Sequence, residues 1–238
     1  EQPTFKYNEG FLLKSLHILH SESATGWGGQ EIRVFQESNL LLERGHRVSI
    51  VCQPESFMWN KCQSITSTNF NCYPLTMKSP ANPFSFFRLL RILKKAKPDV
   101  IHTHSSIDSW LAGSVSKFAG IPVVRSRHIS IPIKSIFPNN WLYSRIPKKI
   151  ITSGEAISNV VTSVSGVKAE NVKSIAAGVD FRRFDFNING EAIRKELLLK
   201  PDQPLIGKIG VIRGWKGYDY LLKAAPLVLK KYPDARFI

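Results

Sequence analysis

A glycine-rich segment, residues 26–29, lies between a predicted strand and a predicted helix. Free backbone N–H groups and the dipole at the start of a helix favour an anion at such a place. Gly28 and Gly29 have no side chain, so the backbone there can approach a phosphate closely. The spacing is neither the three-glycine dinucleotide motif nor a P-loop. The segment therefore predicts either a phosphate-binding loop or a tight turn.

Two histidines stand at the carboxyl end of the strand predicted near residues 99–103, where open α/β sheets bind ligands. Alternation sends His102 and His104 to the same face of the sheet. His104, at the strand tip, is the stronger ligand-binding candidate, and His102 is more typical of a core histidine. We expect no metal, because no further ligand is evident nearby. Asp108, predicted as the N-cap of the next helix, could reach the same cleft or act only as a cap.

The following strand ends in a third histidine, His128, close to Arg125 and Arg127. An imidazole at that position could hold a sugar hydroxyl or organise a reacting centre, and the arginines could meet a phosphate. A solvated basic loop is the alternative interpretation.

A second basic loop, residues 210–217, again lies between a predicted strand and a predicted helix. Arg213 and Lys216 suit a diphosphate, because Arg offers a planar fork of donors and Lys a point charge. Together with the first glycine loop, this loop predicts two half-sites that hold a nucleoside diphosphate across a cleft between two domains.

The composition limits the classes of partner. The 238 residues contain 33 Lys and Arg against 18 Asp and Glu, a formal net charge of +15, which favours anionic ligands, acidic lipid headgroups or nucleic acid. No apolar run approaches the ~20 residues that span a bilayer. Three cysteines argue against a disulfide framework and favour a reducing cytoplasm.

Alternating strand and helix patterns must position these residues. They predict an α/β, Rossmann-like, doubly wound parallel sheet. The predicted strands are 15–20, 46–52, 99–103, 122–125, 149–153 and 172–175; the predicted helices are 30–44, 84–96, 108–118 and 155–164. Residues 54–82 and 131–147 read as loop-rich. After a linker at 176–189, a helix at 191–198, a strand at 205–211 and a helix at 218–231 begin a second domain.

The helix at residues 84–96 is both basic and amphipathic. Arg88, Arg91 and Lys95 share one side, which is typical of contact with an anionic membrane surface. A core-facing helix with a solvated basic side explains the pattern equally well. The opposite arc carries Phe86, Phe87, Leu89, Leu90 and Leu93.

The order of these motifs resembles that of the retaining, nucleotide-sugar-dependent glycosyltransferases of family 4, which have the GT-B architecture of two Rossmann-like domains. The resemblance covers nearly the whole chain. It is carried by Gly28-Gly29-Gln30-Glu31, the segment at 42–48, the segment at 99–104, residues 120–128, residues 152–156, Ala177-Gly178-Val179-Asp180 with Phe184, and the loop with Arg213 and Lys216.

The resemblance implies an acceptor-side domain over residues 1–180 and the beginning of a truncated donor-binding domain over 181–238. It implies a catalytic His128 beside the transferred sugar, Gly28 and Gly29 near the donor phosphate or the acceptor, and Arg213 with Lys216 at the leaving diphosphate. No metal or other cofactor is implied, since basic residues would neutralise the leaving diphosphate. The family's paired-glutamate motif is absent, so we expect this fragment alone to be inactive.

Several members of the family build lipopolysaccharide or other surface glycans. The implied partners are a nucleotide-sugar and a glycan or lipid-linked acceptor, at the inner face of the cytoplasmic membrane. Self-association through the unfinished second domain is also expected. The alternatives are a sugar-nucleotide epimerase of the same architecture, a non-catalytic binding module, or a basic nucleic-acid-binding protein, although no nucleic acid is expected as a partner.

Overall fold

The structure is a computed structural model that describes residues 14–179, 181, 184–185 and 187–238. The chain divides into two compact units, Glu1–Gly178 and Val179–Ile238. The boundary falls after Gly178, whereas the sequence places it after residue 180; Asp180 itself lies outside the described residues.

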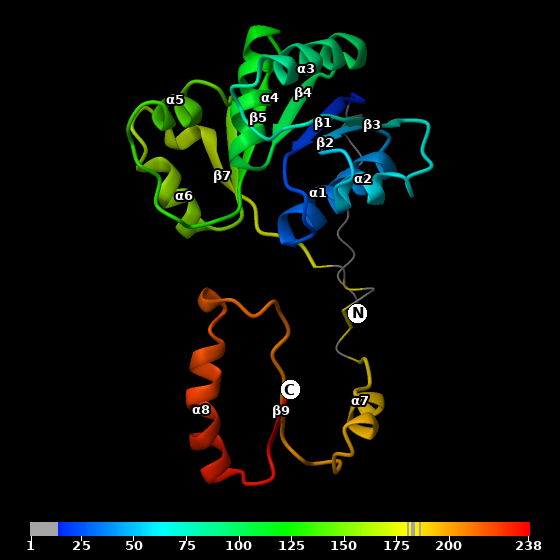
Figure 1. Cartoon of the computed structure of the whole chain (residues 1–238), viewed down its shortest axis with the longest axis vertical. Helices are drawn as coiled ribbons and strands as arrows, with labels where there is room; N and C mark the ends of the chain where they lie inside the picture. The colour runs from blue at the N-terminus through cyan, green and yellow to red at the C-terminus, as the bar shows by residue number, and fades with distance from the viewer. Residues whose placement is uncertain (1–13, 180, 182–183, 186) are drawn as a thin grey trace. The chain divides into compact units, whose positions relative to one another are not determined.

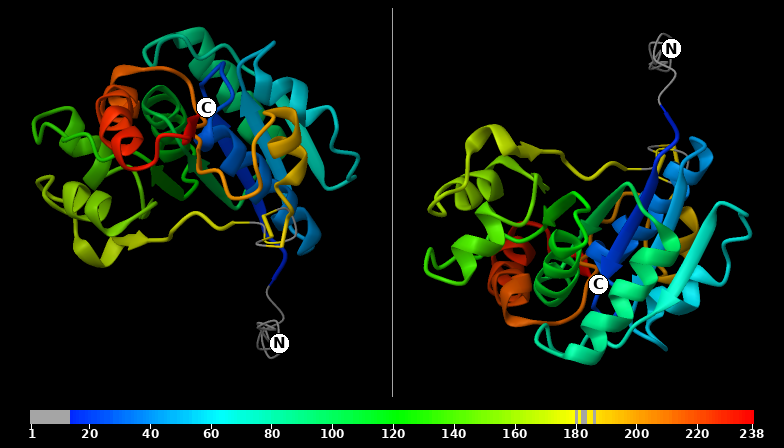
Figure 2. Two further views of the ribbon diagram at one scale, coloured as in Figure 1. Left: turned by 90° about the horizontal axis from the view of Figure 1, so that it is seen from below. Right: turned by 90° about the horizontal axis from the view of Figure 1, so that it is seen from above.

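The first unit is built on a seven-stranded sheet in the order β3-β2-β1-β4-β5-β6-β7, with every neighbouring pair parallel. Its central strand is β4, which lies beside β1, drawn in blue in Figure 2. The predicted doubly wound parallel sheet is therefore confirmed. The strands are β1 (His17–Glu22), β2 (Arg47–Cys52), β3 (Phe70–Pro74), β4 (Val100–Thr103), β5 (Val123–Arg127), β6 (Lys149–Thr152) and β7 (Val172–Ser174).

Helices cover both faces of this sheet (Figure 1). Strand alternation sends Ile50 into a cluster with residues of α1 and α2, and its neighbour Val51 into a cluster with residues of α3 and α4. The helices are α1 (Gly29–Glu43), α2 (Phe57–Cys62), α3 (Pro83–Ala96), α4 (Ser106–Phe118), α5 (Asn139–Ser144) and α6 (Glu155–Thr162), with a short 3-10 turn η1 (Ala169–Asn171).

Helix α1 turns a partly polar face toward the sheet. Its buried residues are Glu31, Val34 and Ser38, whereas the apolar side chains of Ile32 and Leu40 are 36% and 44% exposed. The sheet beneath α1 explains this polar inner face. It carries histidines as well as aliphatic side chains, and Glu37 of α1 contacts His102. A polar inward face therefore suits this helix.

Helix α3 begins where Asn82 accepts a hydrogen bond from the backbone N–H of Phe84 at 2.9 Å, and Pro83 occupies its first position. Leu89 is buried in the core, but Phe84 and Phe87 are 84% and 62% exposed. The predicted apolar arc is thus wrong at Phe87. Figure 1 shows α3 along the upper side of the first unit.

Two segments that read as loops contain regular structure. Residues 54–82 hold α2 and β3, and residues 131–147 hold α5. Helix α2 has only six residues and starts where Ser56 accepts from the backbone of Trp59 at 3.1 Å. A helix of six residues has fewer than two turns, so its apolar period is weak. Strand β3 gives no clean alternation because it is an edge strand with mostly half-buried residues.

The second unit contains α7 (Glu191–Glu196), β8 (Leu205–Ile206), the 3-10 turn η2 (Gly214–Lys216), α8 (Tyr218–Lys231) and β9 (Arg236–Phe237). The prediction of α8 is confirmed at both ends. The strand predicted over 205–211 is shorter, since only two residues pair with β9, and Ile209 and Val211 are 103% and 65% exposed.

Among the described residues, no helix combines the length and the apolar character that crossing a bilayer requires.

Candidate active site

The site residues predicted in the first unit lie in loops at one edge of its sheet. Strands β1, β4 and β5 are adjacent, and the chain runs from β1 toward one edge of the sheet and from β4 toward the other. Ligands of open α/β sheets bind at such a switch point, outside the carboxyl ends of the strands. The loops that follow β1, β4 and β5 carry Gly28, His104 and His128 to that edge.

The glycine loop is held by a buried carboxyl group that was not expected from the sequence. Glu22, the last residue of β1, accepts from the backbone N–H of Ala24 at 2.9 Å and from Nε2 of Gln30 at 2.6 Å. The N–H of Gly28 donates to Oε2 of Glu31 at 2.7 Å. A Cβ placed on Gly29 would meet nothing within 4 Å, so the backbone there faces open space.

Asp108 has a different position from the predicted one. Ser105 is the N-cap of α4, and Asp108 lies three residues into the helix. Its carboxylate accepts from the backbone N–H groups of His104 and Ser105, both at 2.8 Å, and from the Ser105 hydroxyl. Asp108 is fully buried, so it shapes the loop after β4 from within.

The loops after β1 and β4 are joined through their serine hydroxyls. Ser23 Oγ and Ser105 Oγ lie 2.6 Å apart. Glu22 orders the first loop and Asp108 the second. The contact between the serines therefore joins the two ordered loops into one rigid edge. Burial, followed by the nearby Asp108 carboxylate, raises the pKa of Glu22 to about 8. Burial also raises the pKa of Asp108, against the hydrogen bonds from Ser105 and His104.

The arginines that precede His128 do not point toward a solvent-exposed phosphate. Arg125 is 3% exposed, donates to the Tyr143 hydroxyl at 3.1 Å and stacks with its guanidinium carbon 4.0 Å from the tyrosine ring centre. Arg127 donates to the same hydroxyl at 3.0 Å and to the carbonyls of Ile129 and Ile131. Both arginines therefore fix α5 and the loop after β5.

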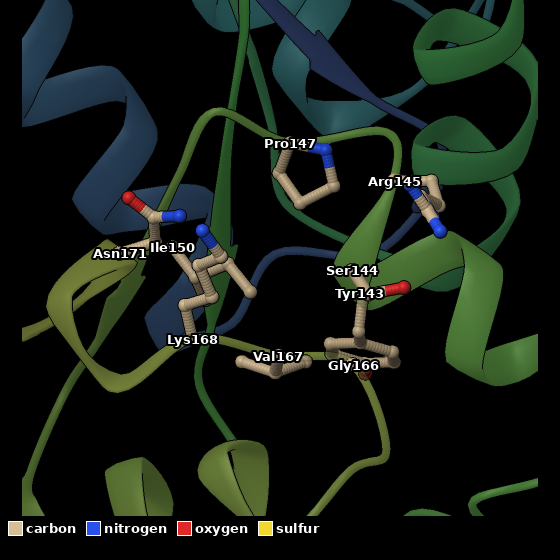
Figure 3. Close-up of a pocket in the computed structure, with 9 residues that line it drawn as sticks. All are labelled: Tyr143, Ser144, Arg145, Pro147, Ile150, Gly166, Val167, Lys168 and Asn171. Carbon is tan, nitrogen blue, oxygen red and sulfur yellow. The ribbon is translucent and has the colours of Figure 1, made fainter.

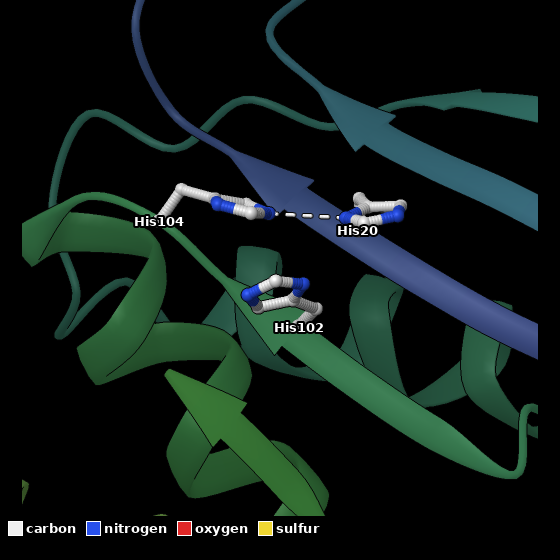
Figure 4. Close-up of side chains that lie close together, drawn as sticks. All are labelled: His20, His102 and His104. Carbon is white, nitrogen blue, oxygen red and sulfur yellow. Dashed lines mark hydrogen bonds between the residues drawn. The ribbon is translucent and has the colours of Figure 1, made fainter. Parts of the chain in front are cut away.

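Four histidines gather between the sheet and α1. His20 and His102 are register partners on β1 and β4, and His20 Nδ1 lies 3.0 Å from Nε2 of His104. Figure 4 shows these two rings end to end, with His102 beside them. The ring centres of His104 and His128 are 6.0 Å apart. We call His20, His102, His104 and His128 the histidine cluster.

His102 is held on both sides. Its Nε2 lies 2.8 Å from the Ser126 hydroxyl, and its Nδ1 lies 3.4 Å from Oε1 of Glu37 on α1. This matches the expectation of a satisfied core histidine. Burial opposes the ionisation of Glu37, but the hydrogen bond from His102 and the charges of His102 and His20 lower its pKa to about 2.

The other rings of the cluster are kept neutral. Burial, then the charge of His102, lowers the pKa of His20 to about 4, and burial with the same neighbours holds that of His104 well below its ordinary value. Burial, then Arg33, lowers the pKa of His128 to about 4. Its Nε2 has no hydrogen-bond partner among the described residues. A neutral imidazole with a spare nitrogen suits a hydroxyl group better than an anion.

Within the part of the chain that the structure describes, one group of side chains could hold a metal ion: His20, His102 and His104. Neither His20 nor Glu37 was expected at the site from the sequence. His20 had a detectable signal, a polar residue in an otherwise buried strand, but its partners become evident only once β1 and β4 are known to be neighbours.

The basic loop of the second unit is compact. Tyr218, the first residue of α8, donates from its hydroxyl to the Gly210 carbonyl at 2.6 Å, and the Lys208 ammonium lies 4.8 Å from the same ring. Arg213 precedes the η2 turn and Lys216 ends it, and both side chains are exposed.

A cavity of about 290 Å³ lies away from these residues (Figure 3). It opens at the amino end of β6, and its lining includes Tyr143, Arg145 and Lys168. Apart from Tyr143, which also binds Arg125 and Arg127, it shares no residue with the edge described above.

Comparisons with known proteins agree with this arrangement. An uncharacterized glycosyltransferase of Methanocaldococcus jannaschii is 26% identical over 156 residues, 60% of this chain and 40% of its own length. A human subunit of phosphatidylinositol N-acetylglucosaminyltransferase is 26% identical over 222 residues, 89% of this chain and 44% of its own. An Escherichia coli UDP-Gal:alpha-D-GlcNAc-diphosphoundecaprenol alpha-1,3-galactosyltransferase is 26% identical over 166 residues, 65% and 43% of the two chains.

The chain spans 36% to 52% of the length of the curated relatives that it matches. Among solved structures, a glycosyltransferase from Rickettsia africae ESF-5 matches with a TM-score of 0.75 and 17% identity, over 94% of this chain and 68% of its own. Anabaena HepE, in complex with UDP and glucose, matches with a TM-score of 0.73 and 15% identity, over 93% and 60%. These likenesses show the GT-B fold.

The family itself is shown by the sequence. The profile of "Glycosyltransferase Family 4" matches residues 27–183, which run from the glycine loop past the last strand of the first unit. The chain therefore belongs to glycosyltransferase family 4.

Proposed function

We propose that the protein containing this sequence is a retaining glycosyltransferase that moves a sugar from a nucleotide donor to a glycan or lipid-linked acceptor. One observation carries the proposal: His128 presents a neutral ring with an unpartnered Nε2 among the described residues, at the sheet edge that also holds the open glycine loop. The family assignment supports the same reaction class.

In this proposal each described residue has a limited task. The N–H groups near Gly29 approach a phosphate or an acceptor oxygen, and His128 binds a hydroxyl of the transferred sugar. Arg213 and Lys216 neutralise the departing diphosphate without a metal ion. Catalysis then rests on positioning and on stabilising charge that develops on the leaving group. The buried Glu22 and Asp108 act indirectly, by holding the two loops.

Relatives support a nucleotide donor and a lipid-linked acceptor. Anabaena HepE has been crystallised with UDP-glucose, and the names of the human and Escherichia coli relatives specify phosphatidylinositol and a diphosphoundecaprenol-linked sugar. We extend this to the synthesis of lipopolysaccharide or another surface polysaccharide, at the inner face of the cytoplasmic membrane.

Helix α3 supports the membrane location. Phe84 and Phe87 are exposed beside Arg88, Arg91 and Lys95, which are also exposed. Aromatic side chains next to basic ones suit an anionic bilayer surface, where the rings enter the interface and the charges meet headgroups.

The donor site is tested by measuring UDP and UDP-sugar binding, and sugar transfer to lipid-linked acceptors, in the 238-residue chain and in any longer native polypeptide that contains it. We expect His128→Ala to lower transfer about 100-fold, the usual scale for one lost transition-state hydrogen bond, while UDP still binds. Arg213→Gln with Lys216→Gln should weaken UDP binding, and Lys230→Gln with Lys231→Gln should not. Failure of both polypeptides to bind any sugar nucleotide would sink the proposal.

The membrane contact is tested by sedimentation with vesicles of phosphatidylglycerol and phosphatidylcholine. Replacing Arg88, Arg91 and Lys95 with Gln should reduce binding, because each basic residue near the surface contributes ~1 kcal/mol. The matched control makes the same charge change in the second unit, at Lys195, Lys230 and Lys231. Equal binding by both triple variants would exclude α3 as the contact.

A further inference from the structure

Three members of the histidine cluster are arranged like metal ligands. One ring nitrogen from each of His20, His102 and His104 lies within 4.8 Å of the others. The three side chains are 0%, 5% and 5% exposed. His20 and His102 come from the adjacent parallel strands β1 and β4, His104 directly follows β4, and Figure 4 shows the three rings close together.

The hydrogen bonding of these rings is incomplete. His20 Nε2 and His104 Nδ1 are buried and have no partner among the described residues. Their other nitrogens face each other at 3.0 Å, where a single proton can be shared. Buried polar atoms without partners are rare in folded proteins, and a bound ion or water is a usual explanation. An ion between His20 Nδ1 and His104 Nε2 would replace that shared proton and leave both outer nitrogens as N–H donors.

We propose that His20, His102 and His104 bind a divalent transition metal ion, with Zn²⁺ as the reference ion. Imidazole is a preferred ligand of zinc, copper, nickel and iron, whereas calcium and magnesium prefer oxygen. Two nitrogens at ~2.0–2.1 Å from a tetrahedral zinc are about 3.3 Å apart. The 3.0 Å between His20 Nδ1 and His104 Nε2 is close to that separation.

His102 completes the site with support from α1. A metal ion would take one of its ring nitrogens, now bound to Ser126 and Glu37, and leave the other for a hydrogen bond. A carboxylate behind a ligating histidine fixes the ring and increases its basicity. Glu37 Oε1, 3.4 Å from His102 Nδ1, is in place to supply that carboxylate.

The neighbouring groups favour a bound cation. Only neutral imidazole binds metal, and neither His20 nor His104 forms an ion pair with a carboxylate among the described residues. A water would occupy the fourth position of a tetrahedral site with three protein ligands. Arg33 is a nearby positive group that opposes the cation. Its charge also lowers the pKa of His104 and His128.

The ion would tie the carboxyl ends of β1 and β4 together beneath α1, and it would brace the loops that carry His104 and the glycines. This role is separate from the transfer chemistry proposed above, which needs no metal. The inference therefore stands or falls independently of the proposed reaction.

The test uses the whole 238-residue chain, without a polyhistidine tag and freed of metal by chelation. Zn²⁺ is titrated in competition with a chromophoric chelator, and thermal unfolding is followed with and without Zn²⁺. We expect one ion per chain and a higher unfolding temperature. His20→Asn and His104→Asn should each weaken binding by more than 100-fold, and Glu37→Gln should weaken it by about 10- to 100-fold.

The matched control is His17→Asn. His17 is also a buried histidine of β1, 4% exposed, but it binds Ser49 and lies outside the group. Its variant should bind Zn²⁺ like the parent chain. If the ligand variants do not fold, X-ray absorption of the parent chain with Zn²⁺ must show three imidazole nitrogens. Substoichiometric binding, fewer imidazoles, or unchanged binding in folded ligand variants would overturn the proposal.

Discussion

The histidine cluster and the buried carboxyl groups share one edge of the sheet but are satisfied in opposite ways. Glu22 and Asp108 accept from backbone N–H groups, an amide and a hydroxyl of their own loops. The histidines leave three ring nitrogens, on His20, His104 and His128, without partners among the described residues. Groups whose hydrogen bonds are all made within the protein fix the backbone, whereas groups with an unpartnered nitrogen can still bind a ligand. The carboxyl pair is thus scaffold, and the histidine cluster is the reactive or ligand-binding part.

The two groups also respond to pH in opposite directions. The pKa of His20 is lower in the folded state than in the unfolded chain. As the pH falls, the unfolded chain therefore takes up this proton at a higher pH, and the free energy of unfolding decreases toward pH 4. Glu22 has a raised pKa, so the unfolded chain loses its proton first as the pH rises, and stability is lost toward pH 8. The first unit should be most stable between these limits.

Among variants that test this difference, Asp108→Ala should lower the free energy of unfolding most. It removes the acceptor of two backbone N–H groups and takes the nearby negative charge from Arg125, whose Nε and Nη1 are buried without hydrogen-bond partners among the described residues. Leaving a buried charge without compensation costs about 3–5 kcal/mol. Urea unfolding, followed by near-ultraviolet circular dichroism of the stacked Trp110–Trp141 pair, would measure the loss.

The control for this variant is Asp202→Ala, which removes an exposed carboxylate and should change stability by less than about 0.5 kcal/mol. Equal, small losses in both variants would show that Asp108 is not part of the scaffold.

Acidification should produce the next largest effect. In metal-free buffer, His20 alone should lower the free energy of unfolding by about 3 kcal/mol between pH 6.5 and pH 4. The pKa of His20 falls from 6.5 to about 4 on folding, and each pKa unit corresponds to ~1.4 kcal/mol. His128 adds in the same direction and Glu22 opposes both, so the contribution of His20 is read from the difference between the parent and the variant. Denaturant titrations at several pH values measure the slope, and His20→Gln should make it shallower. An unchanged slope in that variant would assign the acid sensitivity to other groups.

Glu22→Gln tests the carboxyl side with a smaller effect. At pH 6 the native Glu22 is protonated and resembles the amide, so the variant should be nearly as stable as the parent. At pH 9 the parent must bury a carboxylate, so the advantage of the variant should grow by about 2–3 kcal/mol between pH 6 and pH 9. Unfolding free energies of both chains at pH 6 and pH 9 give the comparison. A variant that is equally destabilised at both pH values would mean that Glu22 is ionised in the native state.

The sequence predicted this architecture better than it predicted the site. The strand and helix alternation of the first unit and both ends of α8 follow from local periodicity, which neighbouring residues determine. The missed elements α2 and α5 have six residues each, and β3 is an edge strand, so their periods are too weak to detect. His104 and His128 stood out because each directly follows a strand.

The remaining site residues could not be found in this way, because their roles depend on contacts distant in sequence. His20 meets His104 across 84 residues, and Glu37 reaches His102 only because α1 covers β4. The same dependence makes Arg125 a partner of Tyr143 rather than of a phosphate. Spacing along the chain carries no information about such pairs until the strand order is known.

The smallest expected effect is the coupling between the two loops. Ser23 Oγ and Ser105 Oγ are 2.6 Å apart, and Ser105 also caps α4, so Ser105→Ala should cost ~1 kcal/mol as a lost cap. A double-mutant cycle with Ser23→Ala isolates the contact between the hydroxyls, which we expect to contribute about 0.5–1 kcal/mol. Ser56→Ala, a cap of α2 with no such cross-loop bond in the structure, serves as the control partner and should be additive with Ser23→Ala. If the effects of Ser23→Ala and Ser105→Ala on the free energy of unfolding were also additive, the two hydroxyl groups would not be coupled. Glu22 and Asp108 would then order their loops independently.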